Sequence, residues 1–508
     1  MKVCSNCNST NIIKKGKDTS GQKQRYKCND CLTNYYIPFN PSLEDETASD
    51  YITPPVDIVK DNKNRKWVIT TAINNSSTNN AFLETLLAYC DYNKAELLIV
   101  PIKYKNNYDE YTWDEELDDF YVDENINLTK DLTLFAGVHV SPTAANPLTG
   151  FEILSRGKSA IIPHPQLMMK CVAVDHINKG AILYTTGCIS NMTYTVTKAG
   201  ERANISHSMS ALIIEEDDDI DDFHIRVLNS DKKGGFYDLE KYYSRDFIWN
   251  LKNVPAIVIG DEHVAHLDLE VVDATFKSYD SLINSINPVH IVRHDVLDFY
   301  ASNHHHKNDF FLQYKKFLDG THIVEDELIN TIEYLIGTTP KTSTSIIVSS
   351  NHNDHLTRWL QEGSPKLEPW NAKLYHKLMY LKLASIEKEE HLTPFELWYN
   401  NEFDFDSIRF IKESESFKIM DIELALHGHY GTNGSRGSAL QYSKLGIKTI
   451  IGHSHTPMII GDCFQVGHSC KAKMGYNQGP SSWHNAHCII HQDGSRQMVF
   501  IKGGKWKL

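Results

Sequence analysis

Short apolar runs rich in Ile and Val recur along the C-terminal half of the chain, and each ends in polar residues able to bind a metal. We predict buried strands from these runs, at 255–260, 289–293, 345–350, 419–426 and 447–451. Such runs are typical of parallel strands covered on both faces. Because ligands bind beyond the carboxyl ends of the strands in open α/β sheets, the pattern predicts an α/β fold with a metal centre at one edge of one sheet.

The first half of the chain alternates between strand-like and helix-like patterns. A helix is expected at 81–90, between strands at 67–71 and 97–102. A β-rich portion should follow, with strands at 160–162, 168–174, 181–185, 192–196 and 211–214. Further along, the apolar spacing over 369–388 predicts a helix that covers a sheet or caps the site.

Changes in composition indicate the domain boundaries. Residues 38–65 combine prolines with acidic and polar residues, which is typical of a linker. At 508 residues the chain is too long for one ordinary core. We therefore expect a small N-terminal unit at 1–40, a linker at 41–65, a mixed α+β domain at 66–250 and the α/β domain at 251–508.

Composition and charge restrict the class of protein. Hydrophobic residues make up 41% of the chain, which is typical of well-packed globular domains. No uninterrupted apolar run reaches the length of a membrane helix, and the N-terminus has no basic-apolar leader of the secretory type. We therefore expect a cytoplasmic protein with no membrane partner. The net charge of −14 argues against nucleic-acid binding over the whole surface, so any such binding must be local.

The polar segments that follow the predicted strands carry metal-ligand chemistry. They are Asp261-Glu262-His263, His294-Asp295, Asn351-His352, His427 and Gly452-His453-Ser454-His455. The chain has 25 histidines, so a single His at a strand end carries little weight. Five such segments, each at a strand end, indicate a metal site. Carboxylate, amide oxygen and imidazole ligands without thiolate suit Mn, Fe or Zn better than Ca.

The order of these segments resembles that of the calcineurin-like metallophosphoesterases, over roughly residues 250–508. The resemblance implies a four-layered α/β sandwich with two metal ions. It assigns one metal to Asp261, His263, Asp295 and His455. The second metal would take Asn351, His427 and His453, together with Asp295 as the bridge.

The chain departs from the family pattern at two places. The family usually has Gly-Asn-His followed by an acidic residue, whereas this chain has Ser350-Asn351-His352-Asn353-Asp354. The acidic residue therefore comes one place late. The second segment has His294-Asp295 where Gly-Asp is common. The metal ligands themselves are unchanged by both departures.

The chemistry of such a site follows from its ligands. A shared carboxylate holds two cations about 3.5–4 Å apart, a spacing that clamps the attacking and leaving oxygens of phosphoryl transfer. Metal-activated hydroxide is then available near neutral pH, so no side-chain nucleophile is needed. His352, next to a ligand, would stabilise or protonate the leaving oxygen. Mn is the first choice of metal, with Fe, Zn or Mg as alternatives.

Two histidine-containing segments lie near the predicted ligands. The glycine-rich segment 427–437 offers His429 and Arg436 as candidate substrate-binding residues, because its glycines allow close backbone approach and an arginine pairs with phosphate. A plain strand-to-helix connection explains this segment equally well. The run His304-His305-His306 cannot direct all three side chains at one metal, so we expect these residues to be mostly exposed.

The N-terminal unit contains two Cys-x-x-Cys knuckles, Cys4-x-x-Cys7 and Cys28-x-x-Cys31. Four thiolates on two tight turns are typical of a structural zinc site. Disulfides are the alternative. They are disfavoured because the other six cysteines are scattered singly, as in a reducing compartment. The run from Gly21 to Cys28 resembles the zinc ribbon at the start of some transposase and phage DNA-binding proteins.

Local charge favours nucleic acid as the partner of this unit. Residues 1–40 hold seven Lys or Arg and two Asp, a net charge of +5. Positive charge beside an aromatic residue suits phosphate contacts, and Lys23, Arg25 and Lys27 are the candidate contacts. A ribbon that only folds, or that contacts a protein, is the alternative.

Together these features favour a metal-dependent phosphodiesterase that acts on DNA, a nuclease of the kind that phages use on host or replicating DNA. For such a phage-encoded protein the expected location is the host cytoplasm. RNA is a second candidate polymer. One alternative keeps the metal centre but changes the substrate to nucleotides or phosphoproteins. The other is a non-catalytic DNA-binding regulatory protein, supported only by the displaced acidic residue Asp354.

Overall fold

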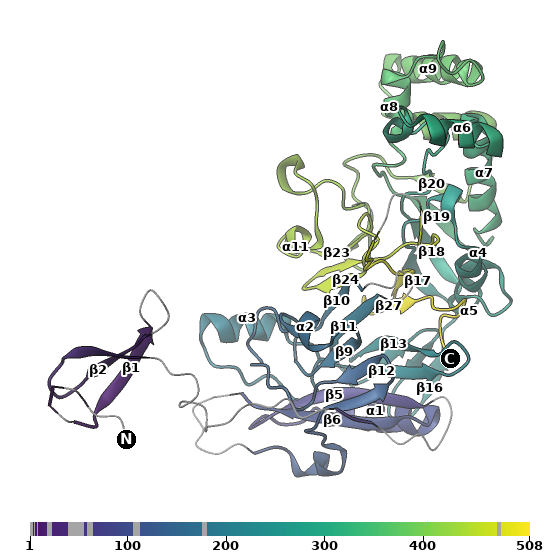
Figure 1. Ribbon diagram of the computed structural model, residues 1–508. Helices are drawn as coiled ribbons and strands as arrows, with labels where there is room; N and C mark the ends of the chain where they lie inside the picture. The colour runs from purple at the N-terminus through teal and green to yellow at the C-terminus, as the bar shows by residue number, and fades with distance from the viewer. Residues whose placement is uncertain are drawn as a thin grey trace. The chain divides into compact units, whose positions relative to one another are not determined.

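The computed structural model describes residues 4, 6–7, 9–17, 23–38, 55–57, 65–104, 112–174, 180–403, 405–474 and 479–508. The chain divides into two compact units, Met1–Pro54 and Pro55–Leu508 (Figure 1). Most of the expected linker at 41–65 lies outside the described residues. Of its described part, Val56–Asp57 forms strand β4 of the second unit.

The first unit is a three-stranded antiparallel sheet. Its strands are β1 (Ile12–Lys17), β2 (Lys23–Cys28) and β3 (Asn34–Pro38), with β2 in the middle. The first Cys-x-x-Cys knuckle precedes β1, and the second begins at Cys28, the last residue of β2, and ends before β3.

A six-stranded sheet in the second unit carries the first three ligand segments. Its order is β20-β19-β18-β17-β26-β27. The strands are β17 (Val254–Val258), β18 (Pro288–Arg293), β19 (Thr344–Ile347), β20 (Ile408–Phe410), β26 (Ala486–Ile490) and β27 (Arg496–Phe500). β17 to β20 are parallel, whereas β26 and β27 continue the sheet in antiparallel fashion. Parallel strands therefore form at the expected 255–260, 289–293 and 345–350.

Alternate residues of β17 and β18 face two different layers. Ile257 and Ile291 pack with the apolar residues of α4 (Leu269–Val272) and α5 (Leu282–Ile286). Val258 and Val292 instead belong to the buried cluster that the other sheets share. Both faces of the strands are covered, which explains why their sequences are apolar without alternation.

An eleven-stranded sheet crosses the expected domain boundary at 250. Its order is β21-β22-β23-β25-β24-β10-β11-β9-β8-β7-β4. From the second half of the chain come β21 (Lys418–Ile419), β22 (Ile422–Glu423), β23 (Lys448–Ile451), β24 (Met458–Ile460) and β25 (Cys463–Gln465). From the first half come β7 (Ile126–Thr129), β8 (Leu132–Leu134), β9 (Ser159–Ile162), β10 (Met168–Val172) and β11 (Ala181–Thr185), besides β4. Since β10 pairs with β24, residues 66–250 and 251–508 form one unit instead of two domains.

Two smaller sheets complete the first half. The four-stranded sheet has the order β13-β12-β5-β6. Its strands are β5 (Lys66–Ile73), β6 (Glu96–Ile102), β12 (Ser210–Asp217) and β13 (Asp222–Asn229), and α1 (Asn80–Asn93) connects β5 to β6. A three-stranded sheet contains β14 (Phe236–Asp238), β15 (Lys241–Tyr243) and β16 (Ile248–Asn250). Short helices α2 (Phe151–Leu154) and α3 (Lys198–Ser206) lie between these strands in the sequence.

Two of the expected strands are absent from the structure in the form we predicted. Residues 192–196 form no strand and lead into α3, whose first turn is capped by Thr197. The expected strand at 419–426 is broken into β21 and β22, because Met420 and Asp421 have φ angles of 50° and 61° and form a tight turn. Apolar content alone does not reveal such a turn.

Most helices of the second half follow β18 in the sequence. They are α6 (Phe310–Asp319), α7 (Val324–Gly337), α8 (His355–Glu362), α9 (Ala372–Glu387), α10 (Pro394–Glu402) and α11 (Ala439–Tyr442). α9 is the helix expected at 369–388. Figure 1 shows α6, α8 and α9 grouped at one end of the second unit. The fold is thus of the predicted mixed α/β class. Within the described residues no helix is both long and apolar enough to cross a membrane.

Candidate metal centre

The predicted ligand segments converge at the carboxyl ends of strands from two sheets. Asp261 and His263 follow β17, Asp295 follows β18, and Asn351 follows β19 in the six-stranded sheet. His427 follows β22, whereas His453 and His455 follow β23 in the eleven-stranded sheet. Our expectation of one sheet edge was therefore wrong, because the last three ligands arrive from the facing sheet.

The first group of ligands is buried and tightly clustered. It consists of Asp261, His263, Asp295 and His455, and one candidate ligand atom from each lies within 4.8 Å of the others. The Nε2 atoms of His263 and His455 are 3.0 Å apart. His455 Nε2 lies 3.2 Å from Asp261 Oδ2, and His263 Nε2 lies 3.7 Å from Asp295 Oδ2. This is the set of residues assigned to one metal.

The second group meets the first at Asp295. His427 Nε2 is 3.1 Å from Asp295 Oδ2 and 3.1 Å from Asn351 Oδ1. His453 Nδ1 is 3.0 Å from the same Asn351 oxygen. Asp295 therefore lies between the two groups, as expected of a bridging carboxylate.

The residues present fit bound cations. Asp261 is fully buried, yet neither of its carboxylate oxygens accepts a well-formed hydrogen bond from the described residues. Burial raises the pKa of Asp261, but the contact with His455 Nε2 at 3.2 Å and the charge of His427 outweigh it and lower the pKa below its usual value. The pKa of Asp295 is likewise held well below its usual value, against the effect of burial, chiefly by the charges of His427 and His352. Buried charges of this kind are normally paired or coordinate metals.

Four of the candidate ligands have a left-handed backbone. The φ angles are 39° at His263, 46° at Asp295, 75° at His453 and 59° at His455. Such conformations cost on the order of 1–3 kcal/mol each for non-glycine residues and cluster at functional sites. Four left-handed residues at neighbouring strand ends indicate that the geometry of this site lowers the stability of the folded state.

Asp298 connects a candidate ligand to the predicted leaving-group residue. Its Oδ1 accepts a hydrogen bond from His263 Nδ1 at 2.9 Å and lies 3.2 Å from His352 Nδ1. Its Oδ2 is 3.4 Å from His266 Nε2. Sequence reasoning missed Asp298, although its position three residues after Asp295 was available as a signal. Asp354, the late acidic residue, is not hydrogen-bonded to His352 among the described contacts.

His294, which stands where the metallophosphoesterases that the sequence resembles usually have Gly, supports the second group. It is fully buried, and its Nδ1 lies 3.3 Å from Nδ1 of His427. A hydrogen bond between these atoms orients the His427 ring and directs its Nε2 toward Asp295 and Asn351. Gly452 leaves room for this arrangement, since a Cβ atom there would lie 2.2 Å from Asp261 Oδ1 and 3.1 Å from His294 Cγ.

A buried ion pair holds the ends of β17 and β18 together. Arg293 Nη1 donates to Glu262 Oε1 at 2.7 Å, and both side chains are fully buried. The guanidinium also donates to Ser345 on β19 and to Thr338 after α7. Tyr334 adds a hydrogen bond to Glu262 at 2.8 Å. Since Glu262 and Arg293 are adjacent to ligand segments, this network fixes their spacing, and sequence reasoning did not anticipate it.

The histidine run near the centre is less exposed than we expected. His305 is exposed, whereas His304 and His306 are half-buried. The His304 ring lies 4.9 Å from that of His355, which in turn lies 4.8 Å from His352. His304 and His355 line a pocket of about 420 Å³ between α6 and α8. His304 is covered by contacts with His355 and Arg358 of α8, whereas His306 contacts Lys316 of α6, and the sequence does not reveal these contacts.

The candidate substrate-binding residues fall in different places. The His429 ring lies 5.3 Å from that of His427, and neither of its nitrogens has a hydrogen-bond partner among the described residues. Arg436 is exposed on the same loop. The structure thus brings His429 to the centre and leaves Arg436 at the surface. In the first unit, Lys27 is half-buried, and the side chains of Lys23 and Arg25 lie outside the described residues.

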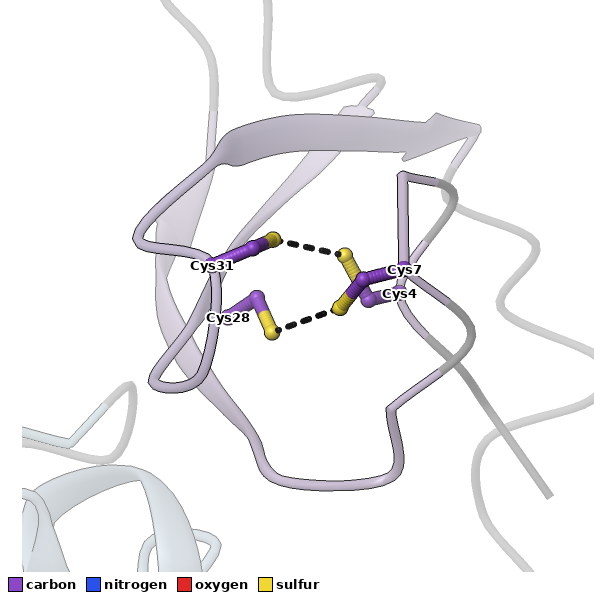
Figure 2. Close-up of side chains that lie close together, drawn as sticks. All are labelled: Cys4, Cys7, Cys28 and Cys31. Atoms are coloured by element: carbon purple, nitrogen blue, oxygen red, sulfur yellow. Dashed lines mark hydrogen bonds between the residues drawn. The ribbon is translucent and has the colours of Figure 1, made fainter.

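The four knuckle cysteines meet at one point in the first unit. Cys4 Sγ is 3.6 Å from Cys31 Sγ, and Cys7 Sγ is 3.6 Å from Cys28 Sγ (Figure 2). All four are free thiols, which excludes the disulfide alternative in this structure. A tetrahedral zinc with Zn–S bonds of about 2.3 Å places its sulfurs about 3.8 Å apart. The cluster therefore fits a structural zinc, as the ribbon prediction requires.

Comparison with known proteins finds a phage relative. The protein named Protein A1, from Escherichia phage T5, is 32% identical to this chain over 468 residues, which cover 87% of this chain and 83% of that protein. This relative supports the predicted phage origin. No family model matches the sequence. No solved structure matches the chain significantly.

Proposed function

We propose that this chain, which belongs to the family of Protein A1 of Escherichia phage T5, is a metal-dependent phosphodiesterase that cleaves DNA. One observation carries the proposal. Asp295 and six further residues able to bind divalent cations, from five separate segments, cluster at the ends of strands from two facing sheets. Such a cluster of buried carboxylates and imidazoles is typical of a catalytic metal site.

The proposal includes a fold family. The order of ligand segments is that of the calcineurin-like metallophosphoesterases, and the layers of helices, six-stranded sheet and eleven-stranded sheet support a metallophosphoesterase sandwich. Two bound divalent cations, with Mn as the first choice, would supply Lewis-acid stabilisation of the phosphate and a water of lowered pKa. The carboxylate of Asp295 lies between the two groups of candidate ligands, near His263 of the first and His427 of the second.

The surroundings of His352 support a role at the leaving group. Burial lowers the pKa of His352, but the charge of Asp295 and the hydrogen bond to Asp298 outweigh it and raise that pKa to about 9. The imidazolium can therefore donate a proton from Nε2 while its Nδ1 is held by Asp298. Such positioned proton transfer contributes about 10²–10⁴-fold to rate. His429, with its two unpartnered nitrogens, is a candidate to contact a phosphate oxygen.

The first unit favours a polymeric substrate. A ribbon with net charge +5 on the same chain raises the concentration of a nucleic acid near the metal centre by tethering, an advantage that a small phosphoester does not obtain. We therefore propose DNA as the substrate, with RNA as the second polymer, in the host cytoplasm of the phage.

The test is a metal screen on labelled single- and double-stranded DNA. Mn is expected to support cleavage by the purified chain, and Asp295→Asn and His352→Ala are expected to abolish or strongly reduce it. His391→Ala is a matched control, because this exposed histidine lies outside every ligand segment. DNA left intact with Mn, Mg, Co and Zn would contradict the proposal. Cleavage of small phosphoesters alone would favour the nucleotide phosphatase.

A further inference from the structure

Helix α6 presents its apolar side to solvent. Five of its large apolar side chains are 58–83% exposed, namely Phe310, Phe311, Tyr314, Phe317 and Leu318. At 3.6 residues per turn these positions fall on one stripe along the helix. An amphipathic helix of a globular protein normally turns such a stripe toward the core. In α6 the orientation is reversed.

Polar contacts hold the opposite side of α6 against the protein. Lys316 is buried, and its Nζ donates to the carbonyl of Tyr300 and lies 3.1 Å from His306 Nδ1. Gln313 Nε2 donates to the carbonyl of His306 at 3.0 Å. Turning the apolar stripe inward would break these contacts and would leave polar groups without partners. The stripe is therefore fixed on the outside of this structure.

The exposed surface extends beyond the helix. The ring of Phe317 lies 5.3 Å from that of His322, which lies 5.4 Å from the ring of Trp370. Trp370 is itself 51% exposed. We call the stripe together with Trp370 the α6 surface. Contiguous exposed apolar patches of this kind mark interaction sites.

The stripe is symmetric about Tyr314. Phe311 and Phe317 lie three residues to either side of it, and Phe310 and Leu318 lie four residues to either side. A two-fold axis through Tyr314 would place Phe311 against Phe317 of a second copy, and Phe310 against Leu318 of that copy. Interfaces between identical chains use one self-complementary patch in this way.

We propose that the α6 surface pairs with the α6 surface of a second copy of this chain, with the two helices antiparallel. The exposed area agrees with this occupant. A covered aromatic side chain buries about 150–250 Å². The exposed parts of the five aromatic residues of the α6 surface therefore supply on the order of 500–800 Å². These residues are Phe310, Phe311, Tyr314, Phe317 and Trp370. A standard interface takes roughly 800 Å² from each partner. Leu318 and the flanking residues supply the remainder.

Self-association of the 508-residue chain tests the proposed pairing of the two α6 surfaces. Sedimentation velocity across the micromolar range is expected to show a dimer, with twice the chain mass of 58.0 kDa. Tyr314→Glu places two like charges on the axis and is expected to weaken the dimer at least about tenfold, as loss of a central aromatic contact does in other interfaces. Tyr279→Glu is the control, because Tyr279 is 99% exposed and lies outside the α6 surface. These positions are exposed, so the variants should keep the fold, and circular dichroism checks this.

A charge exchange makes the test specific for the antiparallel register. Phe311→Lys alone and Phe317→Glu alone should each dissociate the dimer. The double variant brings opposite charges together across the axis and should recover it. A wild-type monomer at every concentration would overturn the proposal, as would a dimer that Tyr314→Glu leaves intact. Binding of the wild-type monomer to phosphatidylglycerol vesicles through this helix would overturn it in favour of a membrane. None of these readouts depends on the chemistry of the metal centre.

Discussion

His352 Nδ1 lies 3.2 Å from Oδ1 of Asp298, an oxygen that also accepts a hydrogen bond from the candidate ligand His263. One carboxylate thus orients both a metal ligand and the residue proposed to protonate the leaving oxygen. In the metallophosphoesterases that the sequence resembles, an acidic residue directly follows the His, but here that residue is displaced to Asp354. The contact with Asp298 shows that the support of His352 does not depend on the displaced residue.

Replacing the two partners of this contact should have different effects. His352→Ala is expected to lower kcat by about 10²–10⁴-fold and to leave metal content unchanged, because the proposed ligand set does not include His352. Asp298→Asn should lower kcat and also weaken metal binding by about 10–100-fold, because it removes the support of His263. Steady-state kinetics with metal analysis of each variant separates the two effects. Metal loss in His352→Ala would contradict the assignment of roles.

Gly452→Ala should disrupt the metal centre. The added Cβ would lie 2.2 Å from Asp261 Oδ1, so the carboxylate must move away from His455. We expect bound metal to fall by at least tenfold, in line with other displaced ligands and their supports. Gly337→Ala is the matched control, because a Cβ at Gly337 meets nothing within 4 Å. Equal metal content in both variants would show that Asp261 is not confined as the structure indicates.

Removing one knuckle cysteine should lower both the zinc content and the DNA affinity of the N-terminal unit. Cys28→Ser removes one of the four thiolates, and zinc content is expected to fall from one per chain to near zero. DNA binding should weaken on the order of tenfold or more and lose part of its salt dependence. The thermal unfolding of the second unit should not change, because the two units are compact by themselves. Cys90→Ala, outside the cluster, is the control, and a similar loss of zinc there would contradict the assignment.

Glu327 should make the second unit less stable as the pH rises through the weakly acidic range. Burial and the charge of Asp298 raise the pKa of Glu327 from 4.5 to about 7. The folded state therefore binds more protons between these values, and stability falls as the pH rises from about 4.5 to 7, by up to about 1.4 kcal/mol per pH unit. Urea unfolding at several pH values measures this slope. Glu327→Gln should flatten it, whereas Glu333→Gln, on an exposed position of the same helix, should not.

The candidate ligands could be predicted from the sequence, whereas the residues that contact and orient them could not. Asp261, Asp295 and His455 could be predicted because each follows an apolar strand within a few residues, so local pattern and chain order suffice. Asp298 and His294 were not given roles, because their contacts with His263 and His427 reach across to residues that follow other strands.

The same distinction explains the fold. The parallel strands before Asp261 and Asp295 were predicted from their apolar runs, which reflect burial on both faces. Pairing between β10 and β24 joins residues nearly 300 positions apart, at Met169 and Ile459 for example, and no local pattern indicates it. The reversed orientation of α6 is equally hidden, because it depends on where Lys316 finds its partners.

Electron paramagnetic resonance of the Mn-loaded chain tests the central claim most directly, because it detects whether two Mn ions lie close enough to couple. We expect the signal of an exchange-coupled Mn pair, consistent with cations about 3.5–4 Å apart. Asp295→Asn should abolish the coupling, whereas His352→Ala should retain it. Only uncoupled Mn in the wild-type chain, or no bound Mn at all, would contradict a two-metal centre at this site.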